Sequence, residues 1–485
     1  MITLSLTEIA GSMHATSSPA DVPVTGGVVQ DSRQVGQGDL FVAIAGERTD
    51  GHRHVAAALA AGAAGALVQD PSVPVADGVD PTRLVVVDDT VAALGDLARH
   101  SLALLRERRR TDVVAVTGSV GKTTTKDLLI DVLSGRGGLV APPGSLNNEV
   151  GLPLTVLRAD ERTATLVLEM GADRVGNLTY LTSVAPPDVA IVLAVGRAHL
   201  GHFGGIENVA RTKSELVTGL RPGGVAVLNL DDHRVAAMAP LAPGRVLTFS
   251  AAGDTSADLY ASDVSVDAAG RAAFTMHAPG EQAEVSLALV GRHHVSNALA
   301  ATAAALALGE PLADVARALA TAGPRSAHRT AVSELPGDVL LLDDSYNANP
   351  DSMRAGLAAL VAISPGRRRL AVLGQMLELG EDSAAEHAGL VPDLLAQQVE
   401  EIVVVGEEAA PLAAAAQEAG IRAHDLTGRS AGHIADAVRA LLRPGDALLL
   451  KGSRGSGVWE VADLLTSDTS AASQTGGPGD GMMHA

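Results

Sequence analysis

A glycine-rich segment at residues 117–125 has the residue types and spacing of a phosphate-binding loop. It reads Thr-Gly-Ser-Val-Gly-Lys-Thr-Thr-Thr and follows an apolar run, residues 113–117, that is typical of a buried strand. When such a turn opens a helix, its backbone N–H groups face a phosphate, and the lysine adds a positive charge near the β- and γ-oxygens. The residues expected around the phosphates are Thr117, Gly118, Ser119, Val120, Gly121, Lys122, Thr123 and Thr124.

The spacing of the glycines departs from the commonest form of this loop. That form has a glycine five positions before the glycine of its Gly-Lys pair, where this chain has Val116. The alternative is a glycine-rich turn that contains a lysine by chance. A strand pattern before the loop and a helix pattern after it, at residues 123–133, favour the phosphate site. The Thr123 hydroxyl is then suited to hold Mg²⁺.

Two more polar side chains follow predicted buried strands. Glu169 comes directly after residues 166–168, and His199 follows residues 189–195. Ligands of open α/β sheets collect at the carboxyl ends of the strands. We therefore expect Glu169 to share a hard cation with Thr123. The alternatives are a helix N-cap for Glu169 and a purely structural role for His199.

The loop Thr-Gly-Ser-x-Gly-Lys-Thr-Thr resembles the ATP loop of the Mur ligases and their folylpolyglutamate synthetase relatives. Further segments resemble this family along nearly the whole chain, so we identify the chain as similar to a Mur ligase. These segments are residues 31–33, 38–43, 46 and 50–52 of a uridine-diphosphate domain, the Asn-Asn loop at 147–153, the metal-binding positions at 169–172 and 198–200, the lysine segment at 213–215, and the adenine-side segment at 293–297.

Residues 343–353, Asp-Asp-Ser-Tyr-Asn-Ala-Asn-Pro-Asp-Ser-Met, resemble one branch of the family. Residues 373–380 and 451–454 resemble the same branch. A sibling branch that adds a diamino acid carries an Asp-Asn-Pro-Arg segment, which this chain lacks. The resemblance implies an enzyme that uses ATP and Mg²⁺ to join D-alanyl-D-alanine to a UDP-N-acetylmuramoyl-tripeptide through an acyl phosphate.

The resemblance also implies a role for individual residues. The catalytic set is Lys122, Glu169, His199 and Lys213, and the metal ligands are Thr123, Glu169, His199 and, if CO₂ carbamylates it, Lys213. ATP is expected to contact His293, Asn297, Arg325, Asp344, Tyr346 and Asn347 as well as the loop. The UDP substrate is assigned to Ser32, Arg33, Gly46, Asn147 and Asn148, and the dipeptide to Asn349, Lys451 and Arg454.

Some positions depart from the family pattern or allow two interpretations. His294 stands where asparagine is usual, Arg197 where proline is common, and Gln375 where aspartate is frequent. The arginine expected near the start of the third domain is Arg325 or Arg329. His387 is either a surface histidine or a contributor to the site.

The elements that must position these residues alternate between strand and helix patterns. Buried strand patterns at residues 163–168, 189–195 and 225–230, separated by helix-length segments, predict a parallel sheet covered by helices. Between residues 258 and 289 the period becomes two, which predicts antiparallel strands. A third alternating unit starts near residue 331.

We therefore expect an α/β protein of three domains. These are a small N-terminal α/β uridine-nucleotide domain at 1–89, a central P-loop ATP-binding domain with a mostly parallel sheet at 90–327, and a C-terminal Rossmann-like domain at 328–465. The Ser/Thr/Gly-rich residues 466–485 are expected to form a disordered tail.

Composition limits the class of protein. The chain has 485 residues, a formal net charge of −20 and no cysteine, which excludes disulfides, thiol nucleophiles and cysteine-bound metals. The acidic balance disfavours nucleic-acid binding. No signal peptide or bilayer-spanning run is evident, so we expect a cytoplasmic protein, without membrane insertion and monomeric.

Two other functions stay open on the sequence alone. One is a different ATP-dependent amide ligase of the same superfamily, for instance one that adds a diamino acid or glutamate. The other is a non-catalytic protein that uses the loop as a nucleotide switch. Glu169, His199 and Lys213 weigh against the second, because a switch would not need them.

Overall fold

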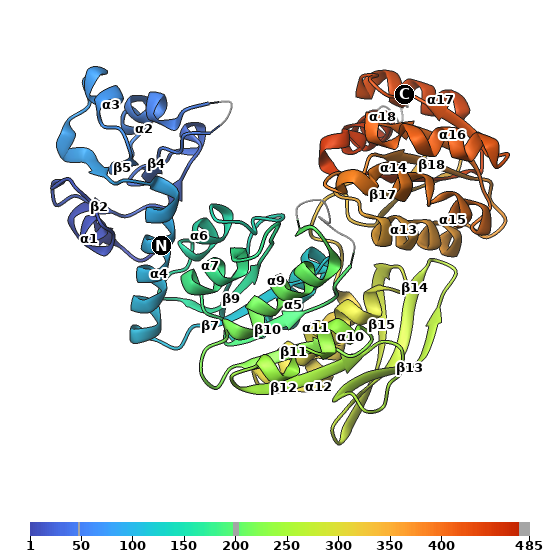
Figure 1. The fold of residues 1–485 in the computed structure, drawn as a ribbon, viewed down its shortest axis with the longest axis horizontal. Coiled ribbons are helices and arrows are strands. Elements are labelled where there is room, and N and C mark those ends of the chain that lie inside the picture. Colours follow the sequence, from blue (N-terminus) through green and yellow to red (C-terminus); the bar gives the residue numbers. More distant parts are fainter. Residues whose placement is uncertain (47–48, 197–202, 475–485) are drawn as a thin grey trace, which may run out of the picture.

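Three α/β units follow one another along the chain. The structure is a computed structural model that describes residues 1–46, 49–196 and 203–474. The N-terminal unit and the C-terminal unit lie at opposite ends of the central unit (Figure 1). The predicted three-domain α/β fold is confirmed. The boundaries predicted after residues 89 and 327 fall just before helix α4 and between α12 and β16.

The N-terminal unit is built on a small parallel sheet in the order β3-β4-β5-β6, beside an antiparallel β1-β2 pair. Asp89 caps helix α4, which leads into the central unit and packs on α6 and α7 there. The elements are β1 (Leu4–Ser5), α1 (Leu6–Ser12), β2 (Pro23–Val24), β3 (Val28–Val29), β4 (Leu40–Val42), α2 (Val55–Ala60), β5 (Gly65–Val68), α3 (Ser72–Ala76), β6 (Leu84–Val86) and α4 (Thr90–Arg108).

The central unit contains a nine-stranded sheet in the order β15-β14-β13-β12-β11-β10-β7-β9-β8. The ladder is parallel from β8 to β13 and antiparallel from β13 to β15, as the two sequence periods predict. The elements are β7 (Asp112–Thr117), α5 (Lys122–Val132), β8 (Gly138–Val140), α6 (Gly151–Val156), β9 (Thr163–Glu169), α7 (Asn177–Val184), β10 (Val189–Val192), α9 (Ile206–Thr218), β11 (Val225–Asn229), α10 (His233–Ala236), β12 (Arg245–Ser250), β13 (Leu259–Val266), β14 (Arg271–Ala278), β15 (Glu281–Val290), α11 (His294–Ala307) and α12 (Leu312–Thr321).

The C-terminal unit has a six-stranded sheet in the order β16-β17-β21-β18-β19-β20, parallel except for the edge strand β16. Its elements are β16 (Ala331–Leu335), β17 (Val339–Asp344), α13 (Pro350–Ile363), β18 (Arg369–Gly374), α14 (Ser383–Ala388), α15 (Val391–Ala396), β19 (Val399–Val405), α16 (Ala410–Glu418), β20 (Arg422–Asp425), α17 (Ala431–Leu441), β21 (Ala447–Lys451) and α18 (Val458–Gln474).

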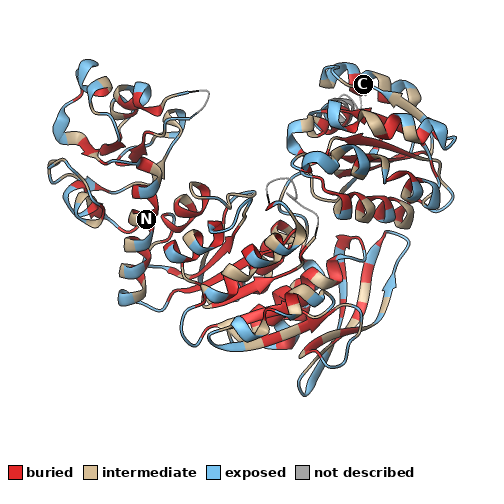
Figure 2. Ribbon diagram, in the orientation of Figure 1, coloured by how far each residue is buried: buried red, intermediate tan, exposed pale blue. Residues whose placement is uncertain are grey.

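The cores are aliphatic, as a chain with 2% aromatic residues requires. Buried residues fill the strands and the helix faces that cover them (Figure 2). Strand β7 is buried along its whole length and lies between β10 and β9, so its carboxyl end, and the loop that follows, have a strand on either side. A loop fixed in this way by a buried strand and a helix is well suited to precise ligand binding.

The C-terminal end differs from the expectation. Helix α18 continues through Gln474, so the prediction of a disordered tail from residue 466 is wrong for residues 466–474. The glycines of the Ser/Thr/Gly-rich segment that indicated disorder all lie beyond Gln474, so residues 466–474 contain no glycine or proline that would end a helix already nucleated at Val458. Residues 475–485 lie outside the described part. Among the described residues, no helix combines the length and the hydropathy that crossing a bilayer demands.

Candidate active site

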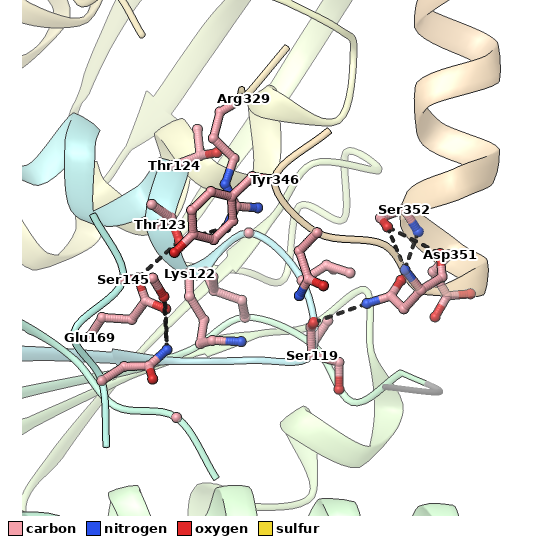
Figure 3. A pocket seen from close by; sticks show the side chains of 18 of the residues that line it. Ser119, Lys122, Thr123, Thr124, Ser145, Glu169, Arg329, Tyr346, Asp351 and Ser352 are labelled. Atoms are coloured by element: carbon pink, nitrogen blue, oxygen red, sulfur yellow. Dashed lines mark hydrogen bonds between the residues drawn. The ribbon is translucent and has the colours of Figure 1, made fainter. Parts of the chain in front are cut away.

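A cavity of about 700 Å³ lies where the carboxyl edge of the central sheet meets the C-terminal unit. Its walls come from the loop before α5, the segment before α6, the end of β9, helix α9 and the start of α11. The C-terminal unit contributes the segment from β17 into α13 and the end of β21. Side chains from both units point into this space (Figure 3). The cavity is therefore formed by two domains together.

The loop between β7 and α5 has the local geometry of a phosphate site. Gly121 has φ +83°, and a Cβ there would come within 2.5 Å of the Asn297 amide oxygen, so glycine is required. Helix α5 begins at Lys122, whose Nζ donates to the Gly118 carbonyl at 2.8 Å. Desolvation lowers the pKa of Lys122, opposed by the nearby Glu169 carboxylate. An anion that enters the cavity would favour the charged form of this lysine, as the Glu169 carboxylate already does.

Glu169 is the last residue of β9, and its carboxylate is buried, with 1% of the residue exposed. It accepts hydrogen bonds from Thr123 Oγ1 at 3.0 Å, Ser145 Oγ at 2.8 Å and Asn147 Nδ2 at 2.7 Å. The alternative of a helix N-cap is wrong, since the next helix, α7, begins only at Asn177. The hydroxyl and carboxylate oxygens are hard donors that suit Mg²⁺.

Lys213 lies on α9 with 4% of its surface exposed and lines the same cavity. Desolvation, aided by repulsion from Lys122, lowers its pKa to about 7. The described residues hold no group of three His, Cys, Asp or Glu side chains arranged for a metal. A cation at Glu169 would need donors besides this group of side chains, and the Thr123 hydroxyl is one that lies beside Glu169. His199 and Arg197 lie outside the described residues.

The start of helix α11 forms another wall of the cavity with His293, His294 and Asn297. The two histidine rings lie 4.0 Å apart between centroids. Burial lowers the pKa of His294 well below its usual value, so this ring is neutral at pH 7. Its Nδ1 accepts from Asn297 Nδ2 at 3.1 Å. A neutral histidine can offer the hydrogen-bonding groups that an asparagine would offer here.

The C-terminal unit brings Asp344, Tyr346, Asn347, Asn349 and Lys451 to the cavity. The ammonium of Lys451 is held 2.5 Å from an Asp344 carboxylate oxygen and donates to the Asn347 carbonyl at 3.1 Å. With 1% of its surface exposed, Lys451 is fixed by this pairing. Asn349 is the N-cap of α13.

The structure favours Arg329 over Arg325 as the arginine of the site. Arg325 is paired with Asp131 on α5 and does not line the cavity. Arg329 does line it, donates to Thr123 Oγ1 at 3.2 Å and stacks 4.3 Å from the centroid of the Tyr346 ring. Its Nε is buried without a partner among the described residues. Arg454 stands on the same ring, at 5.4 Å, outside the cavity wall.

The residues assigned to the UDP substrate are not brought together. Asn147 and Asn148 line the cavity, and Asn147 is engaged with Glu169. Ser32, Arg33 and Gly46 belong to the N-terminal unit and do not line it. Arg33 is exposed and paired with Asp31. A substrate that touches both groups must extend from the N-terminal unit to the cavity.

Three residues around the site were not predicted or were misread from the sequence. Ser145 holds Glu169, and Lys126, buried on α5, donates to the carbonyls of Pro142 and Gly144 at 3.2 and 3.1 Å. Lys126 lies one helical turn after Lys122, which is the signal that could have found it. His387 is neither a surface residue nor part of the cavity wall, because it is buried and its Nε2 accepts from the Met376 N–H at 2.8 Å.

Three family models match the chain in sequence order. The Mur ligase family catalytic domain matches residues 25–101, the Mur ligase middle domain matches 116–305, and the Mur ligase glutamate ligase domain matches 328–454. Together they account for most of the chain and contain all three units of the fold. The chain belongs to the Mur ligase family.

Relatives and solved structures narrow the similarity further. The UDP-N-acetylmuramoyl-tripeptide–D-alanyl-D-alanine ligase of Mycobacterium bovis is 44% identical to this chain, and the match covers 96% of this chain and 98% of the relative. The ligase of the same name from Escherichia coli is 32% identical, and the match covers 96% of this chain and 99% of the relative. A crystal structure of MurF from Acinetobacter baumannii has a TM-score of 0.83 at 31% identity, covering 96% and 99%. MurF ligase from Thermotoga maritima in complex with ADP has a TM-score of 0.78 at 30% identity, covering 93% and 99%.

Proposed function

We propose that this chain is an ATP-dependent amide ligase that joins D-alanyl-D-alanine to a UDP-N-acetylmuramoyl-tripeptide and releases ADP and phosphate. The observation that carries this proposal is the convergence of Lys122, Arg329 and the Glu169–Thr123 pair in one cavity between two domains. The relatives that match nearly the whole chain bear the name of that activity. An amide ligase of this kind needs no enzymic nucleophile, since the substrate carboxylate attacks ATP.

The first step is the activation of the terminal carboxylate of the tripeptide. The β7–α5 loop and Lys122 bind the phosphates, and Arg329 places its guanidinium beside them. The carboxylate then attacks the γ-phosphorus, ADP leaves, and an acyl phosphate results. Two anions must approach each other in this step. The buried cations therefore act chiefly by neutralising charge and fixing the reacting groups.

Mg²⁺, bound to ATP and held by Glu169 and Thr123, would supply Lewis-acid charge neutralisation at the phosphate oxygens. We propose His199 and carbamylated Lys213 as its further protein ligands. Lys213 is suited to carbamylation, because its lowered pKa leaves much of the amine neutral near pH 7. Ser145 and Asn147 orient the Glu169 carboxylate for this task.

The second step is attack of the D-alanyl-D-alanine amine on the acyl carbonyl, after which phosphate leaves. We place the dipeptide on the C-terminal side of the cavity, near Lys451, with Arg454 farther out behind Tyr346. We place uridine diphosphate on the N-terminal unit near Ser32, Arg33 and Gly46. Because the cavity lies between two domains, their approach to each other on substrate binding would limit the access of water to the acyl phosphate.

The compartment and the assembly state follow from the same proposal. ATP and uridine-diphosphate sugars are cytoplasmic metabolites, so we propose that the protein works in the cytoplasm. The cavity is completed by two domains of one chain, which is compatible with a monomer.

An assay of ADP release with alternative amino donors tests the proposal. With the tripeptide nucleotide and ATP, release should require D-alanyl-D-alanine, and Lys122→Ala should reduce it by at least 100-fold, as expected for a lost transition-state charge contact. Acceptance of a free amino acid with rejection of the dipeptide would point to a sibling ligase. Undiminished release by Lys122→Ala would mean that the assigned ATP site is wrong.

A further inference from the structure

Asn349 connects the C-terminal unit to the phosphate-binding loop through a single amide group. Its Oδ1 accepts from the Ser352 N–H at 2.9 Å and so caps α13. Its Nδ2 donates to the Ser119 carbonyl, in the loop before α5, at 3.3 Å. The bond to Ser119 spans the two domains at the edge of the cavity (Figure 3). Asn349 is 8% exposed, so this geometry is sheltered from water.

The chemistry of the asparagine amide matters here. Capping requires only a side-chain acceptor, which Ser, Asp and Asn all provide. Contact with a carbonyl requires a donor, which ionised aspartate lacks. Asn349 performs both tasks at once. The cap alone therefore does not account for asparagine at this position.

Ser119 is held in place from two sides. Its N–H donates to the Ala194 carbonyl at 2.9 Å, and its hydroxyl is bonded to the backbone of Gly196. Its carbonyl is bonded by Asn349. In a planar trans peptide the carbonyl of Ser119 and the N–H of Val120 point in opposite directions. A donor that fixes the direction of the Ser119 carbonyl therefore also fixes the direction of the Val120 N–H.

We propose that Asn349 is a positioning residue that couples the seating of the C-terminal domain to the orientation of the Ser119–Val120 peptide in the phosphate site. When the C-terminal domain is seated, the Asn349 amide holds the Ser119–Val120 peptide in one orientation, and the nucleotide then meets a loop whose donors are already fixed. This inference rests on the proposed function only in taking a nucleotide as the ligand of the loop. It assigns Asn349 to the nucleotide site, whereas the sequence resemblance assigns it to the dipeptide.

The test is binding of ADP with Mg²⁺, measured by titration calorimetry without tripeptide nucleotide or dipeptide. Asn349→Ser keeps a capping hydroxyl, adds no charge and is too short to bridge to Ser119. It should weaken ADP binding about fivefold to tenfold, the worth of one net hydrogen bond. Asn349→Asp keeps the cap but replaces the donor by an anion, so it should weaken binding further. Both variants should keep the thermal midpoint of the wild type, which excludes a general loss of structure.

Ser352→Ala is the matched control. It removes the hydroxyl that accepts from the Asn349 N–H at 3.0 Å but leaves the Asn349 amide able to reach Ser119. This variant should melt at a lower temperature and bind ADP as the wild type does. If Ser352→Ala weakened ADP binding as much as Asn349→Ser, the effect would come from a disturbed start of α13 and not from the bond to Ser119, which would overturn the proposal.

Wild-type ADP affinity in both Asn349 variants would also overturn the proposal. If, in addition, the KM for the dipeptide alone rose, Asn349 would be a dipeptide contact. The ADP measurement needs no amino donor. It therefore stays informative if the wild-type enzyme proves to accept a different donor, so the two proposals can fail separately.

Discussion

Lys213 and Lys122 occupy one cavity, and desolvation lowers the pKa of both amines. For Lys213 the pKa falls to about 7, with repulsion from Lys122 as the second cause. A lysine with a lowered pKa loses its proton above that value, so its amine is neutral on the alkaline side of pH 7. Only a neutral amine reacts with CO₂. The protein has therefore made one lysine reactive while Glu169 keeps its neighbour closer to the charged form.

This difference predicts carbamylation of Lys213 near neutral pH. With ¹³C-labelled bicarbonate, the carbamate signal of Lys213 in a ¹³C NMR spectrum should be weak at pH 6 and rise through pH 7. An ordinary lysine, with a pKa of about 10.4, would need a much higher pH. Lys213→Ala identifies the signal by losing it. Full activity of Lys213→Ala without added short carboxylates would contradict the role of the carbamate.

Arg329 and Arg325 are two nearby arginines of which only Arg329 lines the cavity, so their variants can be compared directly. Arg329 contacts Thr123, and its Nε has no partner among the residues that the structure describes, whereas Arg325 forms an exposed ion pair with Asp131. Arg329→Ala should lower kcat by roughly 100-fold, as lost transition-state donors do. Arg325→Ala should change kcat less than threefold and the free energy of unfolding by about 1 kcal/mol or less. Steady-state kinetics of the two variants at the same enzyme concentration measures both values of kcat. A larger loss of kcat in Arg325→Ala than in Arg329→Ala would reject the assignment of Arg329 to the site.

At the scale of elements, helix α5 positions more than the phosphate loop. Its Lys126 is 2% exposed, pairs with Asp127 at 2.8 Å and anchors the segment that carries Ser145 and Asn147. Those two side chains orient Glu169. Helix α5 therefore determines the position of the phosphate loop and, through residues 142–147, the orientation of the Glu169 carboxylate.

A pair of variants separates the structural from the positioning effect of Lys126. Lys126→Met leaves Asp127 buried and unpaired, so it should lower the free energy of unfolding by about 3–5 kcal/mol. The double variant Lys126→Met/Asp127→Leu removes both charges and should recover most of that loss. Its activity should nevertheless stay low, and it should need a higher Mg²⁺ concentration, because residues 142–147 no longer have the hydrogen bonds from Lys126 to the carbonyls of Pro142 and Gly144. Stability is measured by denaturant unfolding, and activity is measured over a titration of Mg²⁺. If the double variant recovered activity together with stability, Lys126 would have only a structural role.

At the scale of the whole molecule, an acidic chain is proposed to bind anionic ligands. The net charge is −20, yet Lys122, Lys213, Arg329 and Lys451 all line one cavity. Local cations and backbone donors determine the potential in a site, while the overall charge acts mainly on solubility. The three units have different roles in this account. The central and C-terminal units form the cavity, and the N-terminal unit carries Ser32, Arg33 and Gly46, the residues assigned to uridine diphosphate.

Much of this arrangement could be predicted from local sequence patterns. The β7–α5 loop follows a buried strand and Glu169 ends another, so the parallel direction of the two strands places both at the carboxyl edge of the sheet. The choice between Arg329 and Arg325 could not be predicted, since it depends on how the chain turns after α12. His387 was undecided because its partner, the backbone of Met376, comes from packing that leaves no residue signature. The end of α18 was missed because residues 466–485 were judged as one Ser/Thr/Gly-rich segment, although their glycines begin only after Gln474.

The central claim is that this chain ligates D-alanyl-D-alanine to a UDP-N-acetylmuramoyl-tripeptide at the Lys122 site. The most direct measurement is mass spectrometry of the product formed from the tripeptide nucleotide, ATP and D-alanyl-D-alanine. We predict a product whose mass equals the two substrates less one water, formed with one ADP and one phosphate, and absent with Lys122→Ala. Unchanged tripeptide nucleotide in the presence of active, ADP-binding enzyme, or a product that contains a single free amino acid instead of the dipeptide, would contradict the account.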